Sequence, residues 1–218
     1  MDKSRLKEQV RKSFNKIAKE DQGIYDPWYI RPLKEKELME TLRMIKLNKA
    51  SRILDAGCGP GRYIARLASD QIRVVGIDFS INMIKLARYQ NKGKDQYCDF
   101  IVADLEHIPL RDGCFDTVIC VDTLHHLPKD SRRRAIMELG RVLKKEGELI
   151  IDVKNKLNPT FWFGYSRRNV AGFAEAYMIN EIKDIAKKLG LKLVKAKSIV
   201  IPVLSPLIIV KFRKSNLP

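Results

Sequence analysis

The spacing of hydrophobic residues divides the chain into two helical segments followed by a stretch in which strands and helices alternate. Over residues 4–20, apolar side chains recur every three or four positions, which predicts an amphipathic helix. A looser stripe predicts a second helix over 33–46. Glycine and proline residues between 21 and 32 separate these two helices. From residue 51 onward, the apolar residues form short β-branched runs that are typical of buried strands.

These runs, with the helices between them, predict an open sheet. The expected strands are Ser51–Asp55, Arg73–Asp78, Tyr97–Ala103, Phe115–Val121, Glu148–Val153, Leu191–Val200 and Leu207–Phe212. The expected helices of this stretch lie near 61–69, 81–92, 131–144 and 178–189. Strands that alternate with crossover helices favour parallel pairing with both faces covered. The prediction is an α/β fold with a Rossmann-like doubly wound, mostly parallel seven-stranded sheet and helices on both faces.

Length and composition favour one globular domain. The chain has 218 residues, of which 45% are hydrophobic, and this is enough for a substantial core. No run approaches the ~20 apolar residues of a membrane-spanning helix, and no apolar signal core follows Met1. We therefore expect a cytoplasmic protein. The four cysteines have no metal-ligand spacing, which predicts reduced thiols and no metal site.

The net charge of +16 is distributed unevenly. Residues 1–50 carry 13 Lys and Arg against 8 Asp and Glu, residues 51–153 carry 16 against 15, and residues 154–218 carry 13 against 3. A surplus on the flanks indicates an anionic partner, with nucleic acid the first candidate and an acidic lipid surface the second. A surface solvated by lysine would give the same composition, so both interpretations stay open.

A glycine-rich turn follows the first expected strand, with the sequence Asp55-Ala56-Gly57-Cys58-Gly59-Pro60-Gly61. Glycines allow a tight turn and let a ligand approach the backbone N–H groups. Ligands of open parallel sheets bind at the carboxyl ends of the strands, where Asp78 and Asp104 also lie. Asp78 is placed to accept hydrogen bonds from ribose hydroxyls, and Asp104 from an adenine amino group. Each acid alone could equally be a helix cap or a solvated loop residue.

The order of the glycines separates two classes of nucleoside ligand. Dinucleotide sites use G-x-G-x-x-G, whereas this turn reads G-x-G-x-G with Asp55 two residues before the first glycine. A carboxylate at that position would repel a pyrophosphate and attract an ammonium group. The turn therefore favours S-adenosylmethionine (SAM), whose methionine portion carries an ammonium.

With these motifs the sequence resembles the class I SAM-dependent methyltransferases over about residues 10–153. The resemblance is carried by Leu54–Gly61, Gly76–Ser80 with Met83, Ala103–Leu105 with Pro109, and Phe115-Asp116 with Val118. It implies a single domain over 1–218, with N-terminal helices in 1–50, a SAM-binding core in 51–153, and an acceptor-side segment with the last two strands in 154–218. It also implies SAM as donor and S-adenosylhomocysteine as product. The implied cofactor-binding residues are Asp55, Gly57, Cys58, Gly59, Gly61, Asp78, Phe79, Met83, Asp104, Leu105 and Asp122.

Two histidines after the fourth expected strand, His125 and His126, are the candidate catalytic residues. An imidazole could remove a proton from an acceptor hydroxyl or amine as the methyl group moves. Alternatively, one histidine packs beneath the cofactor and the other caps the following helix. Proximity and alignment alone can supply much of the acceleration when the nucleophile is good.

The acceptor is expected to be a small molecule, with tRNA as the alternative. Phe14-Asn15-x-Ile17-Ala18 with Tyr25-Asp26 resembles the ubiquinone/menaquinone methyltransferase group. Leu110–Asp116 and His125-His126-Leu127 are similar to the tRNA wobble-uridine carboxymethyl methyltransferases. That second group esterifies a carboxylate, which needs no general base, and the basic tail would bind phosphates. An RNA-directed enzyme would also imply a small activating subunit.

The acceptor pocket is expected to include the segment Phe161–Arg168. Its aromatic and arginine side chains suit base stacking with phosphate contacts, through Arg167 and Arg168, or a lid over a small substrate. A SAM-binding protein without catalytic activity is the third alternative.

Overall fold

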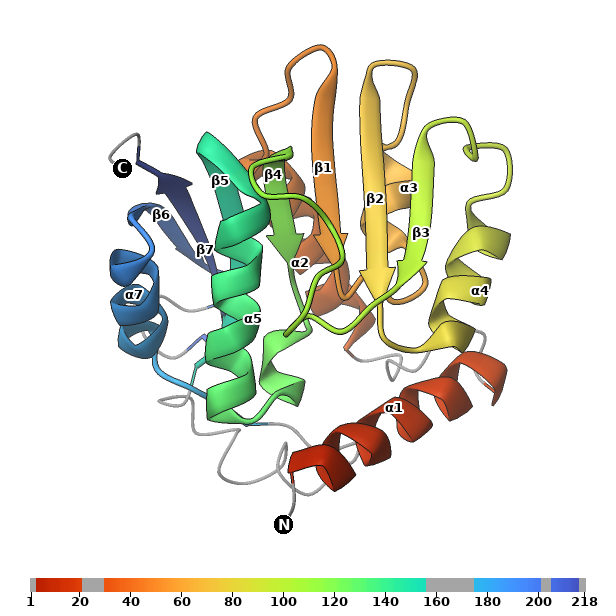
Figure 1. The fold of residues 1–218 in the computed structure, drawn as a ribbon, viewed down its shortest axis with the longest axis horizontal. Coiled ribbons are helices and arrows are strands. Elements are labelled where there is room, and N and C mark those ends of the chain that lie inside the picture. The colour runs from red at the N-terminus through yellow and green to blue at the C-terminus, as the bar shows by residue number, and fades with distance from the viewer. Residues whose placement is uncertain (1–2, 21–29, 156–174, 201–204, 216–218) are drawn as a thin grey trace.

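A computed structural model describes residues 3–20, 30–155, 175–200 and 205–215. Its described part contains a seven-stranded sheet with the strand order β3-β2-β1-β4-β5-β7-β6 (Figure 1). The strands are β1 (Ser51–Ala56), β2 (Ile72–Asp78), β3 (Cys98–Val102), β4 (Phe115–Cys120), β5 (Leu143–Lys154), β6 (Leu191–Ser198) and β7 (Leu207–Lys214). The helices are α1 (Lys3–Glu20), α2 (Arg31–Met44), α3 (Arg62–Leu67), α4 (Ile81–Gln90), α5 (Lys129–Val142) and α7 (Ile179–Lys188), with a 3₁₀ turn η1 at Leu124–His126.

The strand directions confirm the doubly wound prediction. Strands β1 to β5 pair in parallel, and β7 pairs antiparallel with both β5 and β6. The strand order reverses between β1 and β4, and ligands of such sheets bind in the crevice at the carboxyl ends beside this point. The fold therefore directs attention to the loops after β1, β2, β3 and β4.

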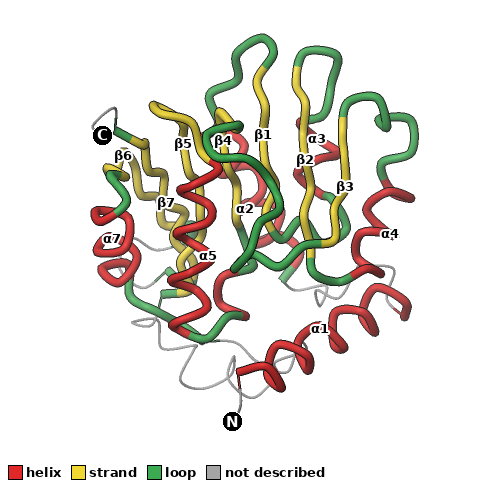
Figure 2. The backbone as a smooth tube through the Cα atoms, viewed as in Figure 1, coloured by secondary structure: helices red, strands yellow, loops and turns green. Residues whose placement is uncertain are grey.

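Two layers of helices cover the sheet (Figure 2). Helices α5 and α7 pack on one face through buried residues such as Leu139 and Ile182. Helices α2, α3 and α4 pack on the other face through Leu38, Ile64 and Ala87. Coverage of both faces explains why the parallel strands are almost continuously apolar and do not alternate.

Helix α1 lies across the carboxyl ends of the first strands (Figure 1). It contacts α4 through both hydrogen bonds and apolar packing. The Asn15 Oδ1 atom accepts a hydrogen bond from Ser80 Oγ at 2.7 Å, and Ile17 packs on Met83. Ser80 in turn caps α4 by accepting a hydrogen bond from the Met83 N–H. The amphipathic stripe of α1 therefore faces the ligand-binding edge of the sheet.

Strand β5 begins at Leu143, whereas the sequence pattern places its start at Glu148. Leu143 pairs with Phe115, and the register then shifts so that Glu148 pairs with Thr117. The charged residues between them hid this early part of the strand, because the apolar run starts only at Leu149. None of the described helices is long and apolar enough to cross a membrane.

Candidate active site

The glycine-rich turn lies between the end of β2 and the loop that follows β4. The N–H groups of Gly57 and Cys58 donate to the Ile77 carbonyl at 2.7 and 2.9 Å. Gly57 has φ +79°, and a Cβ atom there would lie 2.3 Å from Thr123 Oγ1. Gly59 also has positive φ, but a Cβ there would meet nothing within 4 Å. Glycine at position 57 is required by its neighbours, whereas Gly59 faces open space that a ligand can occupy.

Asp78 ties this turn to the start of α4. Its Oδ2 atom accepts a hydrogen bond from the Gly59 N–H at 3.0 Å, and its Oδ1 atom accepts one from the Ser80 N–H at 2.8 Å. Burial raises the pKa of Asp78 to about 6, although these two backbone donors oppose the shift. The carboxylate is thus held rigidly at the end of β2, where a ribose is expected.

Asp55 lies beneath the turn with an unsatisfied oxygen. The residue is 2% exposed, and its Oδ2 atom has no hydrogen-bond partner among the described residues. Burial raises the pKa of Asp55 to about 7; the charge of Arg62 opposes this shift and that of Asp78 adds to it. A buried acceptor without a partner is costly unless a ligand or water satisfies it. A cationic group bound near the turn would supply that partner and favour the ionised carboxylate.

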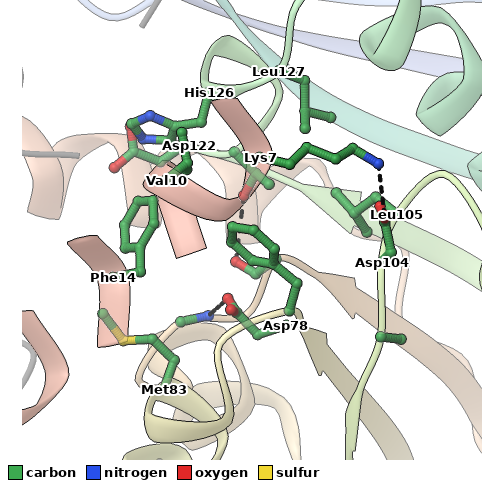
Figure 3. A pocket seen from close by; sticks show the side chains of 15 residues that line it. Lys7, Val10, Phe14, Asp78, Met83, Asp104, Leu105, Asp122, His126 and Leu127 are labelled. Carbon is green, nitrogen blue, oxygen red and sulfur yellow. Dashed lines mark hydrogen bonds and ion pairs between the residues drawn. The ribbon is translucent and has the colours of Figure 1, made fainter. Parts of the chain in front are cut away.

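A pocket opens beside the turn, at the carboxyl ends of β1 to β4 (Figure 3), with about 670 Å³ of empty space when its open mouth is included. Many of the residues expected at the cofactor or the acceptor line it, namely Gly57, Gly59, Asp78, Phe79, Met83, Asp104, Leu105, Asp122 and His126. Other lining residues were not expected, namely Lys7, Val10, Phe14, Ala103, Thr123 and Leu127. The mixture of apolar walls with a few acids suits a nucleoside-containing ligand.

Helix α1 supplies one wall of the pocket through Lys7, Val10 and Phe14. Their spacing of three and four residues puts them on one face of the helix. The Lys7 Nζ atom lies 2.6 Å from Asp104 Oδ2 and also contacts Glu106. The apolar spacing of this segment predicts an amphipathic helix. That spacing does not say which surface of the protein the helix covers, so the sequence did not predict that α1 would line the pocket.

The two histidines occupy different environments. His126 lines the pocket, and its ring meets the edge of Phe14 at a centroid distance of 5.0 Å. His125 is 1% exposed and lies behind it, with the two ring centroids 3.9 Å apart. Burial lowers the pKa of His125 well below its usual value, and nearby positive charges add to the effect. His125 is therefore a neutral imidazole within the protein.

Asp122 has both of its carboxylate oxygens paired with buried lysines. Its Oδ2 atom is 2.5 Å from Lys34 Nζ on α2, and its Oδ1 atom is 2.7 Å from Lys154 Nζ on β5. Although burial opposes the effect, these ammonium groups hold the pKa of Asp122 well below its usual value. Asp122, His125 and Asp152 are close enough together to hold a metal ion. The Lys154 ammonium lies 3.1 Å from Asp152 Oδ2 as well, and so provides positive charge at that cluster.

Several expected site residues support the pocket without lining it. Asp55, Cys58, Gly61 and His125 are not among its lining residues. Gly61 has φ +83°, and a Cβ there would lie 2.6 Å from Asn91 Nδ2, so this glycine allows close packing of α3 on α4. The segment Phe161–Arg168, with Arg167 and Arg168, lies outside the described residues.

The residues of the site fit SAM. Asp55 has an unsatisfied buried oxygen that an ammonium could satisfy, Gly59 leaves open space, and Asp78 and Asp104 both line the pocket. Together with the strand order, they define a class I SAM-dependent methyltransferase domain. The methyltransferase domain family matches residues 54–151, and the chain carries such a domain.

Comparisons with individual proteins agree with this assignment. The chain is 38% identical over 108 residues to the tRNA (carboxymethyluridine(34)-5-O)-methyltransferase of Arabidopsis thaliana, covering 49% of this chain and 25% of that protein. The chain spans about a fifth of the length of three further curated relatives that it matches.

Two solved structures share the fold. A Haloferax volcanii methyltransferase in complex with the Trm112 methyltransferase activator has a TM-score of 0.77 at 16% identity, over 93% of this chain and 98% of that one. Magnesium protoporphyrin IX methyltransferase from Synechocystis, with bound S-adenosylhomocysteine, has a TM-score of 0.75 at 21% identity, over 96% of this chain and 100% of that one.

Proposed function

We propose that the protein transfers a methyl group from SAM to a carboxylate on a modified tRNA uridine. The donor half of the proposal rests on the pocket that brings Asp78 and Asp104 beside the glycine-rich turn. The acceptor half is supported by the tRNA-directed relative and by the basic flanks of the chain. A small-molecule acceptor, which is the expectation from the sequence because that class of enzymes is larger, is the competing outcome.

The proposed binding roles follow from the positions of the acids. Asp78 would accept hydrogen bonds from the ribose hydroxyls, and Asp104 would accept from the adenine amino group. Phe79 and Met83 would form apolar walls for the adenine. Asp55 would balance the ammonium group through its unsatisfied oxygen. When bound, SAM supplies an electrophilic methyl group on a sulfonium that leaves as neutral S-adenosylhomocysteine.

The acceptor side of the pocket is formed by Asp122, Thr123 and His126. A carboxylate oxygen would form the new C–O bond with the methyl carbon as the C–S bond breaks, and the electron pair of that bond stays on sulfur. No proton moves in this reaction, so the protein needs to supply alignment and exclusion of water only. We propose that His126 acts as a wall that orients the acceptor, and that His125 supports its ring from behind. For a hydroxyl or amine acceptor, His126 would instead be the general base.

Label transfer tests the reaction and its acceptor. The protein is incubated with methyl-labelled SAM and with separated RNA, protein and small-molecule fractions of a lysate. We expect label in tRNA that is lost on mild alkaline treatment, because methyl esters hydrolyse under these conditions. The Asp78→Ala variant serves as the control for donor binding. Label in a small molecule, or alkali-stable label in RNA, would contradict the carboxylate assignment.

We also propose that a small activating subunit binds the protein, since the Haloferax volcanii methyltransferase of the same fold is in complex with an activator. Co-expression with a candidate activator from the same source, followed by co-purification and label transfer, tests this. An activity equal to that of the isolated chain would argue against an activating role.

A further inference from the structure

A β-bulge near the free edge of the sheet gathers basic side chains on one face. Strand β6 pairs with β7, and the register shifts between Leu193 and Lys195. Before the shift Lys192 pairs with Arg213, and directly after it Lys195 pairs with Lys211. Because directly paired residues share a face, the extra residue Val194 brings Lys192 and Lys195 to the same side. Strict alternation along β6 would have placed them on opposite sides.

This face is the one covered in part by α2. The Lys197 Nζ atom lies 3.3 Å from Glu40 Oε2 on α2, and Lys211 Nζ donates to the Met44 carbonyl at the end of α2. We call the exposed basic residues of this face, Lys192, Lys195, Lys197 and Arg213, the β6–β7 basic strip, beneath which Lys211 is buried. Figure 1 shows β6 and β7 at the end of the sheet opposite β3.

The charge of the strip is only partly balanced. On β7, Lys211 and Arg213 both pair with Glu148, at 2.7 and 2.9 Å. Within the described ranges, Lys192 and Lys195 on β6 form no ion pair with an acidic side chain, and both are exposed. Like charges directly opposite each other destabilise a sheet, and this pairing places them opposite twice. Glu148 compensates the charges on β7 but not those of Lys192 and Lys195, which a polyanionic partner would balance.

The basic strip runs along the sheet toward the edge that holds the active site. Strand β6 begins with Leu191 opposite Lys214 and ends with Ser198 opposite Ile208. Its end thus lies at the same edge of the sheet as Lys154, which is opposite Leu207 on β7 and pairs with Asp122 in the pocket wall. A polyanion lying along the strip would therefore approach the acceptor side of the pocket.

We propose that the β6–β7 basic strip binds the ribose–phosphate backbone of the RNA acceptor. This inference rests on the proposed function, which requires an RNA acceptor. A lipid surface fits the strip less well, because interfacial binding calls for apolar and basic side chains on complementary parts of one exposed surface. The exposed Leu193 pairs with Phe212 and so lies on the opposite face of the sheet, which leaves Val194 as the exposed apolar side chain at the bulge beside the lysines.

The test compares two variants with the same charge change. In Lys192→Gln/Lys195→Gln, two exposed strip lysines are neutralised. In the control Lys85→Gln/Lys92→Gln, two exposed lysines at the other end of the sheet, on and beside α4, are neutralised. Binding of bulk tRNA is measured by fluorescence anisotropy over a series of salt concentrations. SAM binding by calorimetry checks that each variant is folded and that its cofactor site is intact.

We expect the strip variant to bind tRNA ~10–30-fold more weakly at 0.1 M salt, and its log K versus log salt slope to be shallower by about 1.5. The control should keep both the affinity and the slope of the wild type. An equal loss in both variants, no loss in either, or absence of wild-type binding would overturn the proposal. So would lysine-dependent binding to anionic vesicles without RNA binding. Label transfer to RNA is scored separately, so lysine-dependent tRNA binding without methyl transfer refutes the proposed function and leaves the strip assignment standing.

Discussion

The pH dependence of SAM affinity provides a quantitative test of the site through Asp55. Burial raises the pKa of its carboxyl group to about 7, so much of the ligand-free protein is protonated at this position below neutral pH. A bound ammonium would favour the ionised form and lower that pKa. SAM binding should therefore release a proton at pH 6, and affinity should increase as the pH rises toward 7.

The size of the effect follows from the pKa. If SAM requires the ionised carboxylate, its affinity at pH 6 is reduced about 11-fold, against about 1.3-fold at pH 7.5. The net change is about eightfold. Asp78, whose pKa burial raises to about 6, adds about twofold if it also binds in the ionised form. The pH range over which SAM affinity should rise ends near pH 7.5, because an α-ammonium itself loses its proton with a pKa of ~7.7–8.0.

Calorimetry at pH 6 and 7.5, in pairs of buffers with different ionisation enthalpies, gives both the affinity and the number of protons released. We expect about 0.9 proton from Asp55 at pH 6 and about 0.2 at pH 7.5. The Asp55→Asn variant should bind SAM more weakly at pH 7.5 and should lose most of the pH dependence. Equal affinity at the two pH values, or an unchanged pH dependence in Asp55→Asn, would refute this account of the turn.

Three further substitutions test other parts of the site. Asp78→Ala should weaken SAM binding by about 100-fold or more, because each hydrogen bond to a charged group contributes ~1.5–3 kcal/mol. If calorimetry shows unchanged affinity for SAM, Asp78 does not belong to the donor site. Gly59→Ala should lower the free energy of unfolding, measured in urea, by ~1–2 kcal/mol through backbone strain alone. Gly57→Ala should lower it further, because the added Cβ atom would also collide with Thr123. Equal losses of stability in the two variants would contradict this difference. His126→Gln should leave the single-turnover rate within a few-fold for a carboxylate acceptor, whereas a drop of ~10²–10⁴-fold would identify it as a general base.

Local patterns in the chain were sufficient for the class of fold and the donor. The β-branched runs and the helices between them predict the doubly wound sheet, which the strand order confirms. The spacing of Gly57, Gly59 and Gly61 behind Asp55 predicts SAM rather than a dinucleotide, in agreement with the domain family. These features depend on backbone conformation and hydrophobic periodicity within short segments, and both can be read along the chain.

The surroundings of the pocket could not be predicted in the same way. The pattern of α1 predicts a helix, but only packing on α4 turns Lys7, Val10 and Phe14 toward the pocket. Adjacent in sequence, His125 and His126 differ because the 3₁₀ turn buries one ring behind the other. Likewise, Lys34 and Lys154 meet at Asp122 from elements far apart in the chain.

By itself, then, the sequence determined the fold class and the methyl donor. The tertiary structure alone decided which side chains enclose that donor, which histidine faces the pocket, and which lysines share a face at the edge of the sheet. The reason is physical. A turn or a periodic stripe is specified by interactions between neighbours in the chain, whereas burial, register and the bulge at Val194 depend on pairing between distant segments.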